Sequence, residues 1–157
     1  MKKLFKKDNN KGFTLMEMII VIAIIAILIA LVAPNLISYL NTATDTKVAG
    51  NAKTCYTSAN AWVAQLKIDG KSSPDDKTML TITAKTTADD IKAKVADEDA
   101  AKALIGSLQN ATWGTTETCY IHFNQDGVCD AVKYVSDKAE GYYPTTAEKD
   151  ATISWPK

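Results

Sequence analysis

An uninterrupted run of sixteen apolar residues, from Met18 to Ala33, constrains this chain more than any other feature. Extended back to Phe13, the stretch would measure about 31 Å as an α-helix, which matches the hydrocarbon core of a bilayer. Five lysines and one aspartate precede it in residues 1–12, and basic residues favour retention of their end on the cytoplasmic side. We therefore expect this segment to span a membrane.

A cleaved secretory signal peptide shows the same order of basic and apolar residues, so the cleavage site decides between the two. A cut after Ala33 would leave Leu31 where signal peptidase requires a small residue, and a cut after Ala30 fails in the same way. The first cysteine, Cys55, is too distant for lipid attachment. The sequence therefore predicts that the apolar segment is retained.

The charge balance excludes several classes of protein. The chain has 157 residues, 18 lysines, no arginine and 18 acidic residues. Removing the five lysines and one aspartate of residues 1–12 leaves 13 lysines and 17 acids, so no basic surface indicates nucleic-acid binding. The absence of arginine counts against phosphoryl transfer. No phosphate loop and no Ser/His/Asp arrangement occurs, so we expect neither an enzyme nor a cofactor.

The segment before the apolar run reads Lys-Gly-Phe-Thr-Leu-Met-Glu and resembles the processing site of type IV prepilins. The resemblance is close over residues 6–40 and includes Pro34, at the place of that family's helix-kinking proline. It implies that a membrane peptidase cuts after Gly12 on the cytoplasmic side and methylates the new amine of Phe13. It also implies that Glu17 is an assembly residue.

Glu17 lies one turn inside the apolar helix, where a carboxylate is costly unless it is paired or protonated. A simpler interpretation places it at the headgroup level, where it complements the helix dipole. A cut after Gly12 would create a cationic amine at Phe13, and staggered packing would bring Glu17 of one subunit to the amine of another. We expect this pairing to set the register between subunits, because an unpaired buried charge is costly.

An amphipathic pattern follows the apolar segment and predicts a helix that ends at Asp69-Gly70. Its apolar residues recur at steps of three and four along one face: Val48, Ala52, Cys55, Ala59, Trp62, Val63 and Leu66. We expect one helix from Phe13 to Lys67, bent at Pro34; two helices joined near Pro34 are the alternative.

Residues 71–110 are predicted to form an insertion after this helix. Residues 71–77 are expected as loop and Met79–Thr83 as a strand. Thr87 is expected to begin a helix that continues to about Gln109, with a capping-box-like acid in its first turn. The acidic run Asp97–Asp99 is interpreted as a solvated helix face rather than a calcium site.

Residues 111–157 are predicted to form an antiparallel sheet and a C-terminal loop. Glu117–Phe123 and Val128–Val135 read as a hairpin, with flanking strands at 111–116 and 152–155 and a polar loop at 136–151. The fold class is therefore α+β: a long N-terminal helix packed on a small antiparallel sheet, which is also the architecture that the resemblance implies.

The organisation that follows is a basic leader at 1–12, a membrane-spanning and filament-core half-helix at 13–40, and a globular head at 41–157. We interpret the chain as a pilus subunit that serves adhesion, motility or surface interaction. Its partners would be copies of itself in a helical filament, the prepilin peptidase, the assembly platform with its motor, and the membrane. The precursor would lie in the cytoplasmic membrane, and the filament at the cell surface.

Two other interpretations remain open at this point. A pseudopilin of a type II secretion or DNA-uptake machine shares the same N-terminal pattern. A membrane-anchored binding domain that never polymerises would keep its leader and would be indifferent to the loss of Glu17.

The three cysteines admit several arrangements, since a head outside the cytoplasm would meet conditions in which cysteines pair. Cys55 lies on the buried stripe of the long helix and Cys119 on the apolar side of its strand, so a Cys55–Cys119 disulfide would tie helix to sheet and contribute about 3–4 kcal/mol. Strand parity places Cys129 on the opposite face from Cys119, unless a bulge intervenes.

The other arrangements are a Cys55–Cys129 bond, three buried free thiols, and a zinc site. The zinc site would combine Cys55, Cys119 and Cys129 with His122, the only histidine, although strand parity points His122 away from Cys119.

Overall fold

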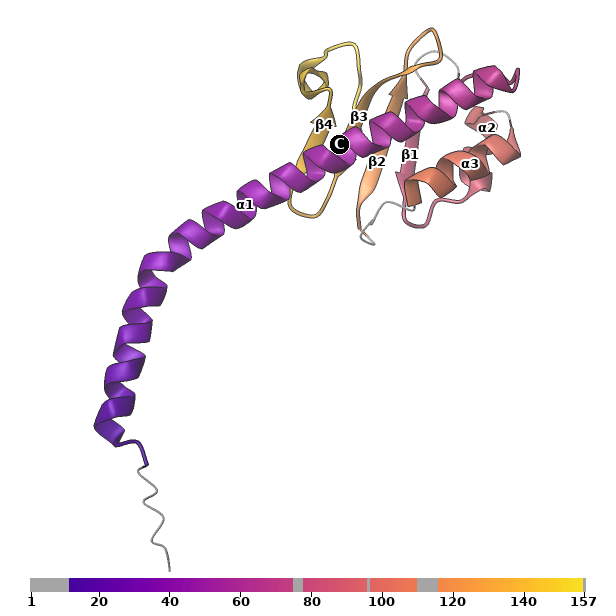
Figure 1. Cartoon of the computed structure of the whole chain (residues 1–157). Coiled ribbons are helices and arrows are strands. Elements are labelled where there is room, and N and C mark those ends of the chain that lie inside the picture. Colours follow the sequence, from indigo (N-terminus) through magenta and orange to yellow (C-terminus); the bar gives the residue numbers. More distant parts are fainter. Residues whose placement is uncertain (1–11, 75–77, 96, 110–115, 157) are drawn as a thin grey trace, which may run out of the picture. The chain divides into compact units, whose positions relative to one another are not determined.

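The computed structural model describes residues 12–74, 78–95, 97–109 and 116–156. The chain divides into two compact units, Met1–Asn41 and Thr42–Lys157. One helix, α1 (Leu15–Ile68), contributes residues to both units and contains Pro34 in its interior (Figure 1). The prediction of a single long helix is thus confirmed, and two separate helices joined near Pro34 are not what the structure shows.

In the first unit, α1 is apolar on all sides and its side chains are exposed. Each Leu, Ile, Val, Met, Phe or Tyr from Phe13 to Leu40 is at least 45% exposed. Such a surface is far larger than the apolar patches that soluble monomers tolerate, so it indicates a helix that lies in a membrane or in an assembly.

In the second unit, α1 has one buried face. Its buried residues are the seven of the predicted stripe: Val48, Ala52, Cys55, Ala59, Trp62, Val63 and Leu66. The helix ends where the sequence predicts, because Gly70 adopts a φ of 68° that favours glycine. The amide of Lys71 then donates to the carbonyl of Leu66 at 2.9 Å and caps the last turn.

The sheet has four antiparallel strands in the order β1-β2-β3-β4. They are β1 (Met79–Thr83), β2 (Thr118–Phe123), β3 (Cys129–Val135) and β4 (Glu140–Tyr143). The predicted strand at 79–83 and the predicted hairpin are confirmed.

The predicted flanking strands were wrong in part. Residues 152–155 form no strand, and most of 111–116 lies outside the described residues. The edges are instead β1 and β4, and the segment predicted as a polar loop at 136–151 contains β4 and the 3₁₀ helix η1 (Thr145–Lys149). In β4, Gly141 brings the backbone against α1: a Cβ there would lie 2.4 Å from the carbonyl carbon of Val48.

Two short helices replace the single one predicted between Thr87 and Gln109. They are α2 (Ala88–Val95) and α3 (Glu98–Gln109). The predicted start is confirmed, since the Thr87 amide and hydroxyl donate to Oδ2 of Asp90 at 2.7 and 2.8 Å. The second helix exists because Asp97 starts it: its Oδ1 accepts from the Ala100 amide at 2.8 Å.

The main core lies between the inner face of the sheet and the helices of the second unit (Figure 1). The described part of α1 in this unit, α2 and α3 all contribute to it, and the indole of Trp62 donates to the carbonyl of Ala100 at 2.8 Å. A smaller cluster lies apart from this core, where Ala147 and Ile153 pack with Ala131 of β3. The α+β fold class is confirmed.

Candidate functional site

The predicted processing segment lies immediately before α1. Gly12, Phe13 and Thr14 are non-helical and exposed, and the helix begins at Leu15. Thr14 donates its amide and its hydroxyl to Oε2 of Glu17, each at 2.8 Å, and the Glu17 amide donates to Oγ1 of Thr14 at 3.2 Å. This reciprocal pattern is a capping box, and it fixes where the helix starts. The Thr-x-x-Glu spacing was the available signal, and sequence reasoning overlooked it.

The apolar half of α1 satisfies the simplest requirement for a membrane span. Among the described residues, α1 is the one helix long and apolar enough to cross a bilayer, by length and composition alone, and its most apolar window has no buried side chain. Pro34 lies inside this helix and has no amide proton, so the carbonyl of Ala30 has no donor at the usual position. The predicted kink at Pro34 stays a prediction.

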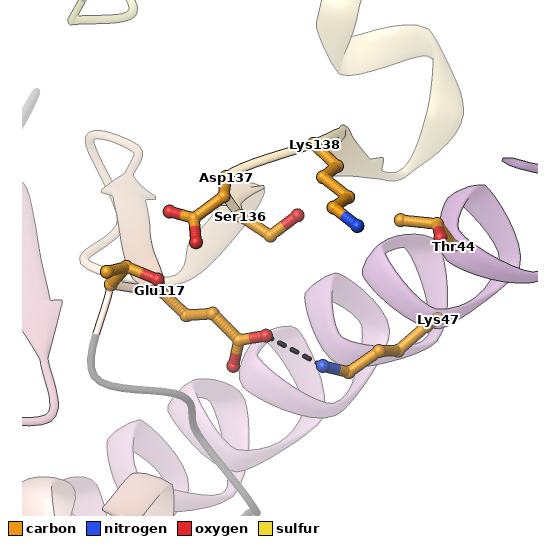
Figure 2. Close-up of a pocket in the computed structure, with 7 residues that line it drawn as sticks. Thr44, Lys47, Glu117, Ser136, Asp137 and Lys138 are labelled. Atoms are coloured by element: carbon orange, nitrogen blue, oxygen red, sulfur yellow. Dashed lines mark hydrogen bonds and ion pairs between the residues drawn. The ribbon is translucent and has the colours of Figure 1, made fainter.

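A second feature, in the other unit, is a polar junction between α1 and the sheet (Figure 2). Lys47 Nζ lies 2.7 Å from Oε1 of Glu117, and the hydroxyl of Tyr134 donates to Oε2 of Glu117 at 2.6 Å. The side chain of Glu117 is only 7% exposed, whereas that of Lys47 is 57% exposed. Burial, and then the hydrogen bond to Glu117, raise the pKa of Tyr134. No pattern of residues indicated this junction.

The junction opens onto a cavity of about 240 Å³ lined by Thr44, Lys47, Thr116, Glu117, Ser136, Asp137 and Lys138. Figure 2 shows side chains from α1, from the start of β2 and from the β3–β4 connection around it. Two lysines and two carboxylates give it a balanced charge, so it has no clear preference for an anion or a cation. Its evident role is structural: a buried carboxylate joins the helix to two strands.

The three cysteines lie in the main core, and we call them the cysteine cluster. The residues Cys55, Cys119 and Cys129 are 1%, 0% and 0% exposed, and all three are free thiols. Cys55 lies on the buried face of α1, and Cys119 lies in the same core on β2. Burial, followed by the neighbouring thiols, raises the pKa of Cys119 well above its usual value.

The expectation that Cys129 faces away from Cys119 was wrong. The register pairs His122 with Ala131 but Phe123 with Cys129, so a β-bulge leaves one residue of β3 without a partner. The bulge shifts the alternation and turns Cys129 to the inner face, where Cys119 lies. Sequence reasoning named a bulge as the exception but had no means of locating it.

The zinc alternative finds no support in the described residues, which contain no group of three or more His, Cys, Asp or Glu side chains suited to a metal ion. His122 instead places Nδ1 at 2.7 Å from Oδ1 of Asp130, the residue within the bulge. The carboxylate of Asp150 also interacts electrostatically with His122. This pairing holds the only histidine outside the cysteine cluster.

Comparison with known proteins gives the class of this chain. A family model described as the prokaryotic N-terminal methylation motif matches residues 7–33. Fimbrial protein Q of Moraxella bovis is 32% identical over 152 residues, which cover 94% of this chain and 92% of that protein. The type IV wide pilus major component PilA4 of Thermus thermophilus is 60% identical over 40 residues, 26% of this chain and 30% of that protein. No solved structure matches the chain.

These findings define a pilin-like structural subunit. The chain has a methylation motif, an exposed apolar half-helix, and a head in which the same helix packs on an antiparallel sheet. Similarity to fimbrial protein Q extends over nearly the whole length of both chains. The chain belongs to the type IV pilin family.

Proposed function

We propose that this protein is the subunit of a type IV pilus or a closely related filament, and that it polymerises through the apolar half of α1. The observation that carries the proposal is the exposed apolar surface from Phe13 to Leu40, on a helix that continues into a packed head. Burial of that surface in a filament core would contribute tens of kcal/mol gross, at about 25 cal/mol per Å². The membrane already buries the same surface, so packing, charge pairing and a motor must supply the net free energy of assembly.

Processing would precede assembly. A prepilin peptidase would cut between Gly12 and Phe13 and methylate the new amine, and this would remove five lysines that would otherwise enter the filament core. The exposed, non-helical placement of both residues supports this step, because a peptidase needs an extended and accessible bond. The methylation-motif match over residues 7–33 supports it independently.

Glu17 would then pair with the Phe13 amine of a neighbouring subunit. The pairing would give subunits a defined stagger, since an unpaired carboxylate in an apolar core is costly. The assembly platform and motor would draw each processed subunit from the membrane into the growing fibre. Nothing in this scheme requires an enzymatic site in the chain.

A pseudopilin would carry the same N-terminal signals, and its deletion would leave long surface fibres in place. The names of the two relatives, a fimbrial protein and a pilus major component, favour the surface filament. The role of the fibre, in adhesion, motility or surface interaction, follows from the resemblance alone.

The processing step is tested by the N-terminal mass of the full protein purified from cells. We expect the mature chain to start at Phe13 with one added methyl group. Gly12→Val should leave the full-length precursor in the membrane, because a branched side chain does not fit where the smallest residue is required. An intact Met1, or a cut after Ala33, in assembled filaments would contradict the proposal.

The assembly step is tested with Glu17→Ala, which leaves the membrane anchor and the cut bond unchanged. We expect normal synthesis and cleavage but few filaments in sheared-fibre preparations. Asp45→Ala is the matched control, since it removes an exposed carboxylate from the same helix outside the apolar half. A normal fibre yield from Glu17→Ala would show that this carboxylate is incidental to assembly.

A further inference from the structure

The cysteine cluster has no role in the proposed assembly, yet it buries three thiols from three elements in one hydrophobic core. Cys55 comes from α1, Cys119 from β2 and Cys129 from β3. All three residues belong to the main hydrophobic core. α1 is distant in the sequence from β2 and β3, so a bond from Cys55 to either strand would constrain the whole second unit.

Geometry distinguishes one pair within the cluster. Cys119 pairs with Tyr134 in the register of β2 and β3, whereas Cys129 pairs with Phe123, four residues further along β2. The side chain of Asn60 donates to the carbonyl of Cys129 at 3.0 Å, so Cys129 lies beside a part of α1 more than one turn beyond Cys55. This arrangement favours Cys119 as the partner of Cys55. The thiol of Cys129 is directed along its own strand, where Sγ donates to the carbonyl of Ala131 at 3.8 Å. The bulge that turns Cys129 inward thus also provides its thiol with a local partner.

We propose that Cys55 and Cys119 are joined by a disulfide in the exported protein, and that Cys129 remains a free thiol. The two thiols would lose two protons and two electrons to a protein or small-molecule disulfide outside the cytoplasm, which would be reduced to two thiols. The extracytoplasmic location rests on the proposed function. The structure describes the reduced form of this pair.

The bond must form while the second unit folds. Thiol–disulfide exchange requires a thiolate and access for the oxidant, and the folded core offers neither. All three thiols are at most 1% exposed, and burial raises the pKa of Cys119 and of Cys129. The consequence is kinetic: a chain that folds reduced stays reduced, and a chain that folds oxidised is protected from reductants.

The proposal is tested by counting thiols in the full-length protein purified from cells that produce it natively. The sample is denatured in the presence of a maleimide, with and without a chelator, and the labelled residues are identified by peptide mass. We expect one labelled thiol, Cys129, and a linked peptide pair containing Cys55 and Cys119. Three labelled thiols, a linked pair that includes Cys129, or thiols masked only until the chelator is added would overturn the proposal.

Two cysteine variants keep the proposal testable even if one of them folds poorly. Cys129→Ser should leave no labelled thiol and an intact link, whereas Cys119→Ser should yield two labelled thiols. Reductant should lower the urea midpoint of the wild-type protein and leave that of Cys119→Ser unchanged. The N-terminal mass measured on the same sample reports leader removal separately, so failure of the processing proposal is distinguishable from failure of the disulfide.

The timing is tested on protein purified in the reduced state and folded in detergent. Addition of glutathione disulfide should leave three free thiols for hours in the folded protein, whereas the same addition during dilution from urea should yield the Cys55–Cys119 bond. Rapid oxidation of the folded protein would show that the cluster is accessible and would overturn the kinetic argument.

Discussion

Substitution of Gly141 by alanine should destabilise the second unit strongly, although it adds a single methyl group. At this residue β4 lies against the backbone of α1. A Cβ would lie 2.4 Å from the carbonyl carbon of Val48, 2.5 Å from its oxygen and 2.6 Å from the amide nitrogen of Ala49. Ordinary van der Waals contact begins at 3.4 Å, so helix and strand must separate by about 1 Å.

Neither partner can move freely. Gly141 is held in the sheet by its pairing with Tyr134, a residue with no exposed surface, and Val48 lies in the main core at 1% exposure. Overpacking of a well-packed core typically costs about 1–3 kcal/mol, and a clash with backbone atoms belongs at the upper end because no rotamer change relieves it. We expect a loss of about 3 kcal/mol, which reduces the folding equilibrium constant by a factor of about 150.

The matched control is Gly106→Ala, in α3, where an added Cβ meets nothing within 4 Å. Alanine is the better helix former, so this variant should gain about 0.5–1 kcal/mol. Urea unfolding of the full chain in mild detergent, followed by tryptophan fluorescence, measures both changes. If the free energy of unfolding of Gly141→Ala lies within about 0.5 kcal/mol of the wild-type value, the close approach of β4 to α1 is wrong.

Two further predictions concern charged groups of the second unit. Lys47→Met should cost about 1–2 kcal/mol in urea unfolding, because it leaves the buried carboxylate of Glu117 without its cation while the exposure of Lys47 limits the loss. The double variant Lys47→Met/Glu117→Gln should regain part of the lost free energy of unfolding. Equal stability of the single and double variants would contradict the argument. Backbone hydrogen bonds at the starts of α2 and α3 lower the pKa of Asp90 and of Asp97 below 3.8. Their stabilisation is therefore complete above the unfolded-state pKa and is lost as the pH falls through the lowered values, so the urea midpoint should decline below about pH 4. Asp97→Asn should flatten this decline, and an unchanged slope would show that the cap does not contribute.

The parts of the fold that sequence reasoning predicted are those set by local periodicity. All seven residues of the predicted stripe on α1 are buried, because a helix that packs on a sheet requires apolar residues every three or four positions. The end of α1 before Gly70 and the start of α2 after Thr87 were also predictable, since capping depends on residues within one turn. The hairpin of β2 and β3 followed from alternation on either side of a turn.

The parts that were missed depend on contacts between distant residues. β4 was assigned to a loop because its four residues carry no apolar alternation, and its place is fixed by pairing with β3 and by the close approach of Gly141 to α1. The break between α2 and α3 was missed because Asp97 reads equally well as a helix-face residue or as a cap. The inward position of Cys129 depends on one unpaired residue in β3, which changes the face of everything beyond it.

The capping box at the start of α1 bears directly on how Glu17 can serve assembly. A carboxylate that caps its own helix and also pairs with a neighbour's amine has two roles that could compete for the same oxygen. Both Thr14 donors, however, reach the same oxygen, Oε2, at 2.8 Å. The second oxygen, Oε1, can therefore accept a cationic donor while the cap stays in place. The cap in addition restricts the rotamers of the carboxylate before a neighbour arrives, so less side-chain entropy is lost when the two charges meet. A glutamate three residues after a threonine thus provides in one group a fixed helix start and an oriented acceptor for the amine that the proposed cut at Gly12 would create.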